Sequence, residues 1–161
     1  QKKDAWKIIL YYWNDDHYFI LIKFINRGLI SQYRLKNFQY ELILQDDPRN
    51  LLALNNKGYS LSKLKKFNAA IECYNQSLEI KPDDKTVLVN KISAYRKTGQ
   101  INDALNLCNK ILEKNPDEMI VLYHKLRLLK KLNRFTESNE VCDKILKKYP
   151  SNEDVRNEFI K

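Results

Sequence analysis

Hydrophobic side chains recur along this chain mostly at intervals of three or four residues, the spacing that gathers them on one face of an α-helix. Between residues 51 and 84 the pattern forms two such stretches, which predict two helices of about 13 residues joined by a short turn. Their packed faces are expected to carry Leu54, Gly58, Leu61 and Leu64 in the first helix and Phe67, Ala70, Ile71, Tyr74 and Leu78 in the second.

The same pattern returns twice further along the chain. The corresponding residues are Leu88, Ile92, Tyr95, Ile101, Ala104, Cys108, Ile111 and Leu112, and then Leu122, Leu126, Leu129, Phe135, Ser138, Cys142, Ile145 and Leu146. Small residues recur where paired helices must approach closely, at Gly58, Ala70, Ala104 and Ser138. A larger side chain there would push the helix axes beyond about 8 to 10 Å, the usual packing distance. The bulky Phe67, Tyr74 and Phe135 are expected to fill the space beside them.

Four prolines mark the length of the repeated unit. They are Pro48, Pro82, Pro116 and Pro150, and they are evenly spaced: the first interval is 82 − 48 = 34, and the other two are equal to it. Proline lacks the amide donor and clashes with the preceding turn, so it ends a helix at the same point of every unit. Short polar residues and carboxylates follow each proline, and we expect them to cap the next helix and favour its N-terminus.

These features together resemble the tetratricopeptide repeat (TPR) family. The resemblance rests on Gly58, Leu61, Ala70, Tyr74 and Pro82 in one unit and on Tyr95, Gly99, Ala104 and Pro116 in the next. It implies an all-α fold, a right-handed TPR superhelix (α-solenoid) of antiparallel helix pairs. In that fold the first helix of each pair lines a concave groove, and the second helix forms the convex outside.

The unit length divides the chain into successive parts of one solenoid domain. Residues 17–50 are predicted to form a degenerate repeat, with Phe24 and Lys36 where small residues belong, and residues 51–84, 85–118 and 119–150 to form regular repeats. Residues 1–16 are predicted to form a lone N-terminal helix, the remnant of an earlier repeat or a cap. Residues 151–161 are predicted to form a capping or truncated helix. The chain begins at Gln1 without a methionine, so we expect it to be a fragment of a larger protein.

The implied groove selects candidate binding residues from the exposed side of each first helix. The candidates are Asn55, Tyr59, Lys63, Val89, Asn90, Ser93, Arg96, Lys97, Tyr123, Arg127, Lys130 and Lys131, with His124 near the rim. Amides can hold a peptide backbone and cations attract carboxylates, so we expect a protein or peptide partner that carries acidic residues. The three lysines at equivalent positions, Lys63, Lys97 and Lys131, are interpreted as mainly solubilising, whereas Tyr123, Arg96 and Arg127 have binding and structural interpretations of equal weight.

One subclass of the family can be tested by residue type. TPR domains that capture the acidic tails of heat-shock chaperones use a two-carboxylate clamp of lysine, asparagine, asparagine, lysine and arginine on three successive first helices. The matching positions here are Asn55, Tyr59, Asn90, Ile120 and His124, of which Asn90 alone agrees. The clamp is therefore disfavoured, and the identity of the partner stays open.

The positive charge suggests an alternative partner. The net charge is +9, and residues 119–161 contribute 10 − 6 = +4 of it, so a single-stranded RNA-binding helical repeat is a second hypothesis. Nucleic acid is the weaker candidate because carboxylates are interspersed with the cations on nearly every helix. The sequence contains no glycine-rich phosphate-binding loop and no nucleophile paired with a general base, so it is not expected to be an enzyme. It could instead be a regulatory TPR segment of a larger enzyme.

Cysteine and histidine usage predicts neither a metal site nor a disulfide framework. Cys73, Cys108 and Cys142 form no Cys-x-x-Cys pair, and His17 and His124 are far apart in sequence, so no metal or cofactor is expected. Cys108 and Cys142 take a packing position, whereas Cys73 is expected to be partly exposed. Few, unpaired cysteines favour a reduced, cytoplasmic protein, and no apolar run is long enough to predict a membrane span. The oligomeric state is not predicted.

Overall fold

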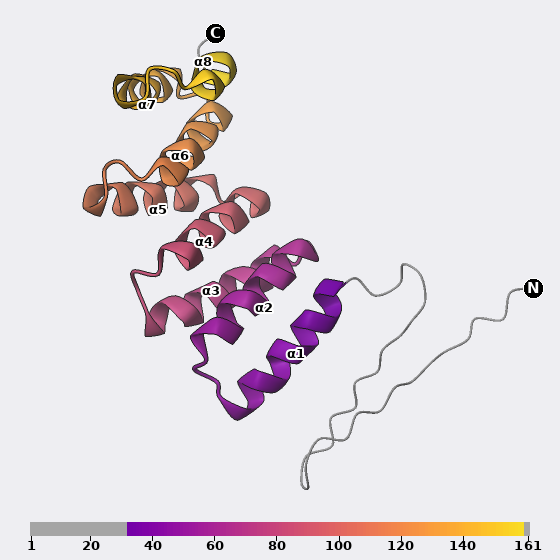
Figure 1. The fold of residues 1–161 in the computed structure, drawn as a ribbon. Helices are drawn as coiled ribbons and strands as arrows, with labels where there is room; N and C mark the ends of the chain where they lie inside the picture. Colours follow the sequence, from indigo (N-terminus) through magenta and orange to yellow (C-terminus); the bar gives the residue numbers. More distant parts are fainter. Residues whose placement is uncertain (1–31, 160–161) are drawn as a thin grey trace, which may run out of the picture.

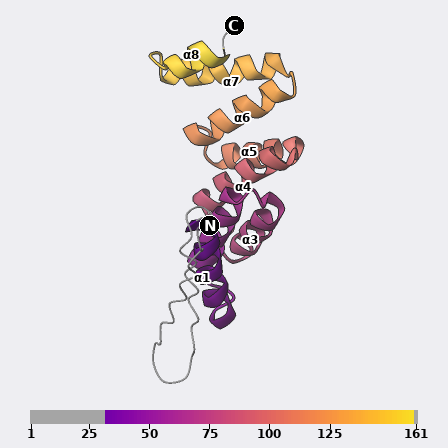
Figure 2. The same cartoon turned by 90° about the vertical axis from the view of Figure 1, so that its right-hand side faces the viewer.

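The computed structural model describes residues 32–159, and this part of the chain consists of helices joined by short turns. The helices are α1 (Gln32–Asp46), α2 (Leu51–Lys63), α3 (Phe67–Ile80), α4 (Lys85–Thr98), α5 (Ile101–Lys114), α6 (Met119–Lys131), α7 (Phe135–Lys148) and α8 (Glu153–Phe159). Each packs against the next, which produces an elongated array with α1 at one end and α8 at the other (Figures 1 and 2). The all-α solenoid expected from the sequence is confirmed.

Polar residues just after Pro48 and Pro82 begin the first helices of two pairs. Asn50 Oδ1 accepts a hydrogen bond from the Ala53 amide at 2.9 Å, and Asp84 Oδ1 accepts from the Thr86 and Val87 amides at 3.1 and 3.2 Å. These bonds satisfy amides that have no partner within the helix. At α6 the expectation of a capping side chain is wrong, because Glu118 occupies the N-cap without such a bond.

The first helices end on a left-handed residue at one fixed place in the repeat. Lys65 has φ 61°, Gly99 has φ 83° and Asn133 has φ 56°, and successive members of this set are one repeat length apart. A left-handed residue stops the helix and turns the chain back for the second helix of the pair. Glycine and asparagine tolerate this conformation, whereas lysine is strained by its β-carbon.

Small residues lie at the helix contacts where the sequence placed them. Ala70 and Ala104 are completely buried and Ser138 is 4% exposed. Apolar residues of α4 to α8 form one continuous core cluster that ends at the buried Val155, and a second cluster joins α2, α3 and α4. Each helix pair therefore buries its apolar face partly against its neighbours in the array.

Two sequence-based expectations about packing are wrong. Phe135 does not fill the core, because its position at the start of α7 leaves it 58% exposed. Cys73 was expected to be partly exposed and is only 6% exposed, since it faces the second core cluster.

Ion pairs with the period of the repeat join successive units on the surface. Lys114 Nζ lies 2.7 Å from Asp83 Oδ1, and one repeat later Lys148 Nζ lies 2.7 Å from Asp117 Oδ2. The hydrogen bond from Lys148 lowers the pKa of the Asp117 carboxyl. Because these pairs are exposed, they orient the neighbouring units more than they stabilise them.

The ends of the array test the sequence only in part. The predicted N-terminal helix at 1–16, and residues 17–31 of the predicted degenerate repeat, lie outside the described residues. α1 packs against α2, and α8 packs against α7. No helix within 32–159 has both the length and the apolar character required to cross a bilayer.

Candidate functional site

The candidate residues lie on α2, α4 and α6, the first helices of three successive pairs, and we call the surface that they form the inner face. The second helices α3, α5 and α7 support it through the buried core. Asn90 Nδ2 donates a hydrogen bond to Asn55 Oδ1 at 3.3 Å, which links the inner faces of α2 and α4. Each amide keeps further donor or acceptor capacity for a bound backbone.

An aromatic group occupies the α2 end of the inner face. Tyr59 is 44% exposed, and its ring lies edge-on to Tyr33 of α1 with the ring centroids 6.3 Å apart. Lys63 Nζ lies 5.0 Å from the centre of the Tyr59 ring, within the range of a cation–π contact. The structure thus brings together two candidate residues, and it gives Lys63 a specific neighbour that its solubilising interpretation did not include.

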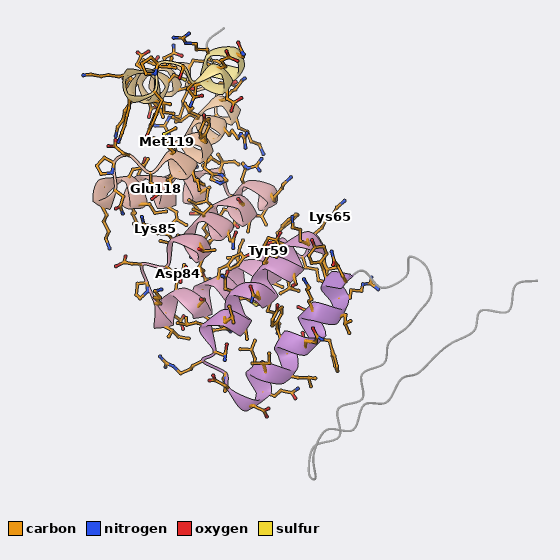
Figure 3. The ribbon with its side chains drawn as sticks, in the orientation of Figure 1. Tyr59, Lys65, Asp84, Lys85, Glu118 and Met119 are labelled. Carbon is orange, nitrogen blue, oxygen red and sulfur yellow. The ribbon has the colours of Figure 1, made fainter. Side chains whose placement is uncertain are left out.

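A cavity of about 320 Å³ separates α4 from α6, and we call it the apolar cavity. Its lining residues are Lys85, Thr86, Val89, Asn90, Ile111, Glu118, Ile120 and Val121. Lys85 Nζ and Glu118 Oε2 lie 3.0 Å apart at its border, so the two charges nearest the cavity pair with each other. Figure 3 shows both residues on the same side of the array, each beside the start of its helix.

A cationic group lies further along α4 and α6. Burial, followed by the positive charges of Arg96 and Arg127, lowers the pKa of His124 to about 4. His124 is therefore neutral at pH 7. Arg96 Nε and His124 Nδ1 are both buried and have no hydrogen-bond partner among the described residues.

A second cavity, of about 310 Å³, lies between α6 and α8, and we call it the polar cavity. It is lined by Ile120, Tyr123, His124, Arg127 and Asp154. Ile120 borders both cavities and is 55% exposed. The two cavities therefore lie on either side of one apolar side chain at the start of α6.

The phenol of Tyr123 is used within the fold. Tyr123 Oη donates a hydrogen bond to Asn152 Oδ1 at 2.9 Å, and the same asparagine oxygen accepts from the Val155 amide at 3.1 Å. Tyr123 therefore helps to hold the N-terminus of α8. The sequence left both a binding and a structural interpretation of Tyr123 open, and these hydrogen bonds support the structural one.

The remaining candidates lie in the C-terminal halves of α4 and α6. Ser93 is half-buried on α4, while Lys97, Lys130 and Lys131 are exposed and line neither of the two cavities. Their charges can attract an acidic partner from a distance, but their positions define no pocket.

Seven residues that border the cavities were absent from the candidate set: Lys85, Thr86, Ile111, Glu118, Ile120, Val121 and Asp154. The repeat register relates three of them. Thr86, Ile120 and Asp154 are successively one repeat length apart and hold the same groove position in successive units. Glu118 pairs with Lys85 from the opposite end of the same unit, and the periodicity of a single helix does not predict this pair.

The described residues include no group of three or more histidine, cysteine or acidic side chains arranged to hold a metal ion. Burial raises the pKa of all three cysteine thiols, to about 12 for Cys108. The groups offered at the inner face are thus amides, cations and apolar surface, which are suited to binding.

Comparison with known proteins identifies the repeat. Residues 52–84, the span of α2 and α3, match the family model of the tetratricopeptide repeat. This span is a tetratricopeptide repeat, in agreement with the resemblance seen in the sequence. A search of curated proteins returns no match.

Solved TPR structures share the arrangement of the helices. A TPR protein from Parabacteroides merdae superimposes with a TM-score of 0.72 and 24% identity over 77% of this chain and 50% of that one. The chain thus spans about half the length of that protein. MamA from AMB-1 gives a TM-score of 0.67 at 22% identity, over 78% of this chain and 68% of MamA.

A third similar structure contains a ligand. The second TPR domain of human RPAP3, in complex with the HSP70 peptide SGPTIEEVD, gives a TM-score of 0.56 at 16% identity. The match covers 60% of this chain and 81% of that domain. At these identities, the comparisons establish a shared fold.

Proposed function

We propose that this protein is a non-catalytic interaction scaffold that binds a segment of another polypeptide on its inner face. The observation that carries the proposal is the exposure of large apolar side chains there. Leu52, Tyr59 and Ile120 are 71%, 44% and 55% exposed, and all three belong to first helices. Leu52, Tyr59 and Ile120 hold outward positions of these helices beside polar groups, an arrangement typical of a protein-binding surface.

The surrounding polar groups support an acidic peptide as the ligand. The Asn55–Asn90 amide pair can bond to a peptide backbone, and Arg96 and Arg127 are placed to attract carboxylates. That the similar RPAP3 domain binds a peptide is consistent with this use of the fold. The proposal places the protein in the class of binding modules and assigns no reaction to the described residues.

The direct test uses a displayed library of short random peptides selected against the whole chain. Selected peptides are then measured against a double variant of the inner face, Tyr59→Ala with Arg127→Glu. The matched control is Phe135→Ala with Lys147→Glu on α7, because Phe135 and Lys147 are exposed and lie on a second helix. We expect the inner-face variant to lose binding by about tenfold or more and the control to retain it.

Two results would contradict the proposal. One is a set of peptides whose affinity falls with the α7 control and not with the inner-face variant. The other is tight, salt-sensitive binding of single-stranded RNA that competes with every selected peptide, which would favour the nucleic-acid alternative. Circular dichroism of both variants, compared at equal concentration, shows whether they remain folded.

A further inference from the structure

The turns inside the helix pairs lie along one edge of the array, and the turns between the pairs lie along the opposite edge. Each helix packs against the next in the same order, so equivalent turns follow one another along the array. In Figure 3, Lys65 in the turn between α2 and α3 lies on the opposite side of the view from Lys85 and Glu118, which stand at the starts of α4 and α6. The residues of the two edges can therefore be compared position by position.

The two edges differ in charge. The turns inside the pairs, residues 62–67, 96–101 and 130–135, contain three, two and three lysines or arginines, and none of these turns contains an aspartate or glutamate. Each of the turns between pairs, residues 46–51, 80–85, 114–119 and 148–153, has a net charge of −1 or zero. We call the edge formed by the turns inside the pairs the basic edge.

Carboxylates neutralise the cations unequally on the two edges. Between pairs, lysines lie beside carboxylates of the neighbouring turn, as Lys114 does beside Asp83 at 2.7 Å. Next to the basic edge, the first turns of α5 and α7 supply Asp103 and Glu137, and Glu137 pairs with Arg134. Two carboxylates against eight cations leave an excess of positive charge, which attracts an anionic surface.

One exposed apolar side chain belongs to the basic edge. Phe135 follows Arg134 at the start of α7 and is 58% exposed, whereas Ile101, at the equivalent position of α5, is only 8% exposed. One turn further along, the buried Leu105 of α5 is replaced by the exposed Asn139 of α7. This part of α7 is therefore a polar surface, on which the exposed ring is isolated beside the cations of its own turn.

An exposed aromatic ring among cations favours a lipid surface over nucleic acid. Lysine and arginine attract anionic headgroups, and an aromatic side chain can bury its ring at the boundary between headgroups and acyl chains. Single-stranded nucleic acid would also meet cations here, but its successive bases stack on a series of aromatic side chains. The turns of the basic edge contain two aromatic residues, of which Phe67 is half-buried and Phe135 is exposed.

We propose that the basic edge docks on the surface of an anionic lipid bilayer, with the Phe135 ring inserted among the headgroups. The contact is centred on the turn between α6 and α7, because successive pairs are rotated: α5 lies across the view of Figure 1, whereas α7 is seen nearly end-on. A flat bilayer cannot touch all three turns at once, so the cations of the other two turns contribute by attraction over about a Debye length. The inference is independent of the proposed function, since Arg134 and Phe135 are not among the candidate residues of the inner face.

The first test measures sedimentation of the whole chain with vesicles of phosphatidylcholine that contain about one quarter phosphatidylserine. We expect binding to these vesicles, none to pure phosphatidylcholine, and release as the salt concentration rises from about 0.1 to about 0.5 M. Lys131→Gln with Arg134→Gln should weaken binding by about tenfold or more. The matched control is Lys110→Gln with Lys147→Gln, which removes the same charge at exposed positions of α5 and α7 and should weaken binding by less than about threefold.

Phe135→Ala tests the insertion of the ring without a change of charge. It should weaken binding to the anionic vesicles by about three- to tenfold. Tyr149→Ala is the matched control, because Tyr149 is a 41% exposed aromatic residue at the other end of α7, and it should leave vesicle binding unchanged. Circular dichroism of each variant shows whether the helices are retained.

Fluorescence provides a readout that is specific to the position of the ring. Phe135→Trp is introduced together with Trp6→Phe and Trp13→Phe, which removes both native tryptophans. The emission should shift to shorter wavelength with anionic vesicles and should be quenched by lipids that carry bromine on their acyl chains. A Tyr149→Trp variant in the same background should show neither change.

The outcomes separate the lipid proposal from the proposed function. Absence of vesicle binding, equal binding to neutral vesicles, or equal loss in the charge variant and its control refutes the lipid proposal and leaves the scaffold standing. Selected peptides that are insensitive to the inner-face variant refute the scaffold alone. Tighter binding of polyuridine RNA than of the anionic vesicles at equal salt, lost with Lys131→Gln and Arg134→Gln, would assign the basic edge to nucleic acid and overturn the lipid proposal.

Discussion

The ring of Tyr74 on α3 lies directly against the backbone of α2 at Gly58. A β-carbon added to Gly58 would stand 2.5 Å from Tyr74 Cε1 and 2.8 Å from its Cδ1, closer than carbon atoms can approach. The ring is only 1% exposed, so it has little room to move. The absence of a side chain at Gly58 thus permits the close contact of the first regular helix pair.

Gly58→Ala is expected to destabilise the fold although alanine favours helices. Overpacking of this kind costs about 1 to 3 kcal/mol, which exceeds the gain of about 1 kcal/mol in helix propensity. Urea unfolding followed by circular dichroism measures the change. In a Tyr74→Leu background the aromatic ring is gone, so adding Gly58→Ala should cost less stability than it does in the original protein. A Gly58→Ala variant that is more stable than the original protein would contradict the contact.

Lys65→Gly is expected to stabilise the turn between α2 and α3. Lys65 has φ 61°, a conformation that costs a residue with a β-carbon about 1 kcal/mol. The reciprocal change, Gly99→Ala, should destabilise by a similar amount through the backbone alone, since no atom lies within 4 Å of the added carbon. Lys66→Gly serves as the control, because it removes the same charge at φ −89°. A higher melting temperature for Lys66→Gly than for Lys65→Gly would contradict this explanation.

The stability of the protein should fall between pH 6.5 and 4 because of His124. Burial, then Arg96 and Arg127, lower its pKa from 6.5 to about 4, so in this range the unfolded chain binds a proton that the native state does not. The contribution is complete above pH 6.5 and is lost as the pH falls toward 4, by at most about 3 kcal/mol.

His124→Gln isolates this effect from the titration of carboxylates elsewhere in the chain. Chemical denaturation of the two proteins at a series of pH values should show a difference that grows through this window. Parallel stability curves would mean that His124 is protonated as easily in the native protein as in the unfolded chain.

The three cysteines should be unreactive in the folded protein. Cys73, Cys108 and Cys142 are buried, and burial raises the pKa of each thiol, so little reactive thiolate is present near neutral pH. A chromogenic disulfide reagent should label all three thiols in urea and none rapidly without it. Fast labelling of a folded sample, resolved by mass spectrometry to Cys73, would show that α2 and α3 separate readily.

Comparison of the three regular units shows how far the size pattern extends. Tyr74 faces Gly58, and the equivalent pairs of positions are held by Cys108 with Ile92 and by Cys142 with Leu126. The large and small residues have exchanged places, and all four later residues are almost completely buried. The sequence shows that the residue types at both positions differ between units. The contact of Tyr74 with Gly58 explains why the two positions differ together, because the side chains there share one space.

The burial of other side chains depended on which neighbouring helix covers them. Helical periodicity correctly placed Ala70 and Ala104 inside, but it also placed Phe135 there and left Cys73 partly exposed. The period describes one helix, and burial depends also on the offset of the adjoining helix. For the same reason, the bond from Tyr123 to Asn152 could not be foreseen, since it joins successive units.

The proline interval and the helical periodicity of the apolar residues determined the all-α class, the turn positions and the faces that pack. These are local properties, because a proline or an apolar stripe acts through the geometry of a single helix. The tertiary structure decided where unlike side chains from different units meet, such as His124 and Asp154 at the polar cavity. Their separation in space depends on how the units stack, which no single repeat encodes.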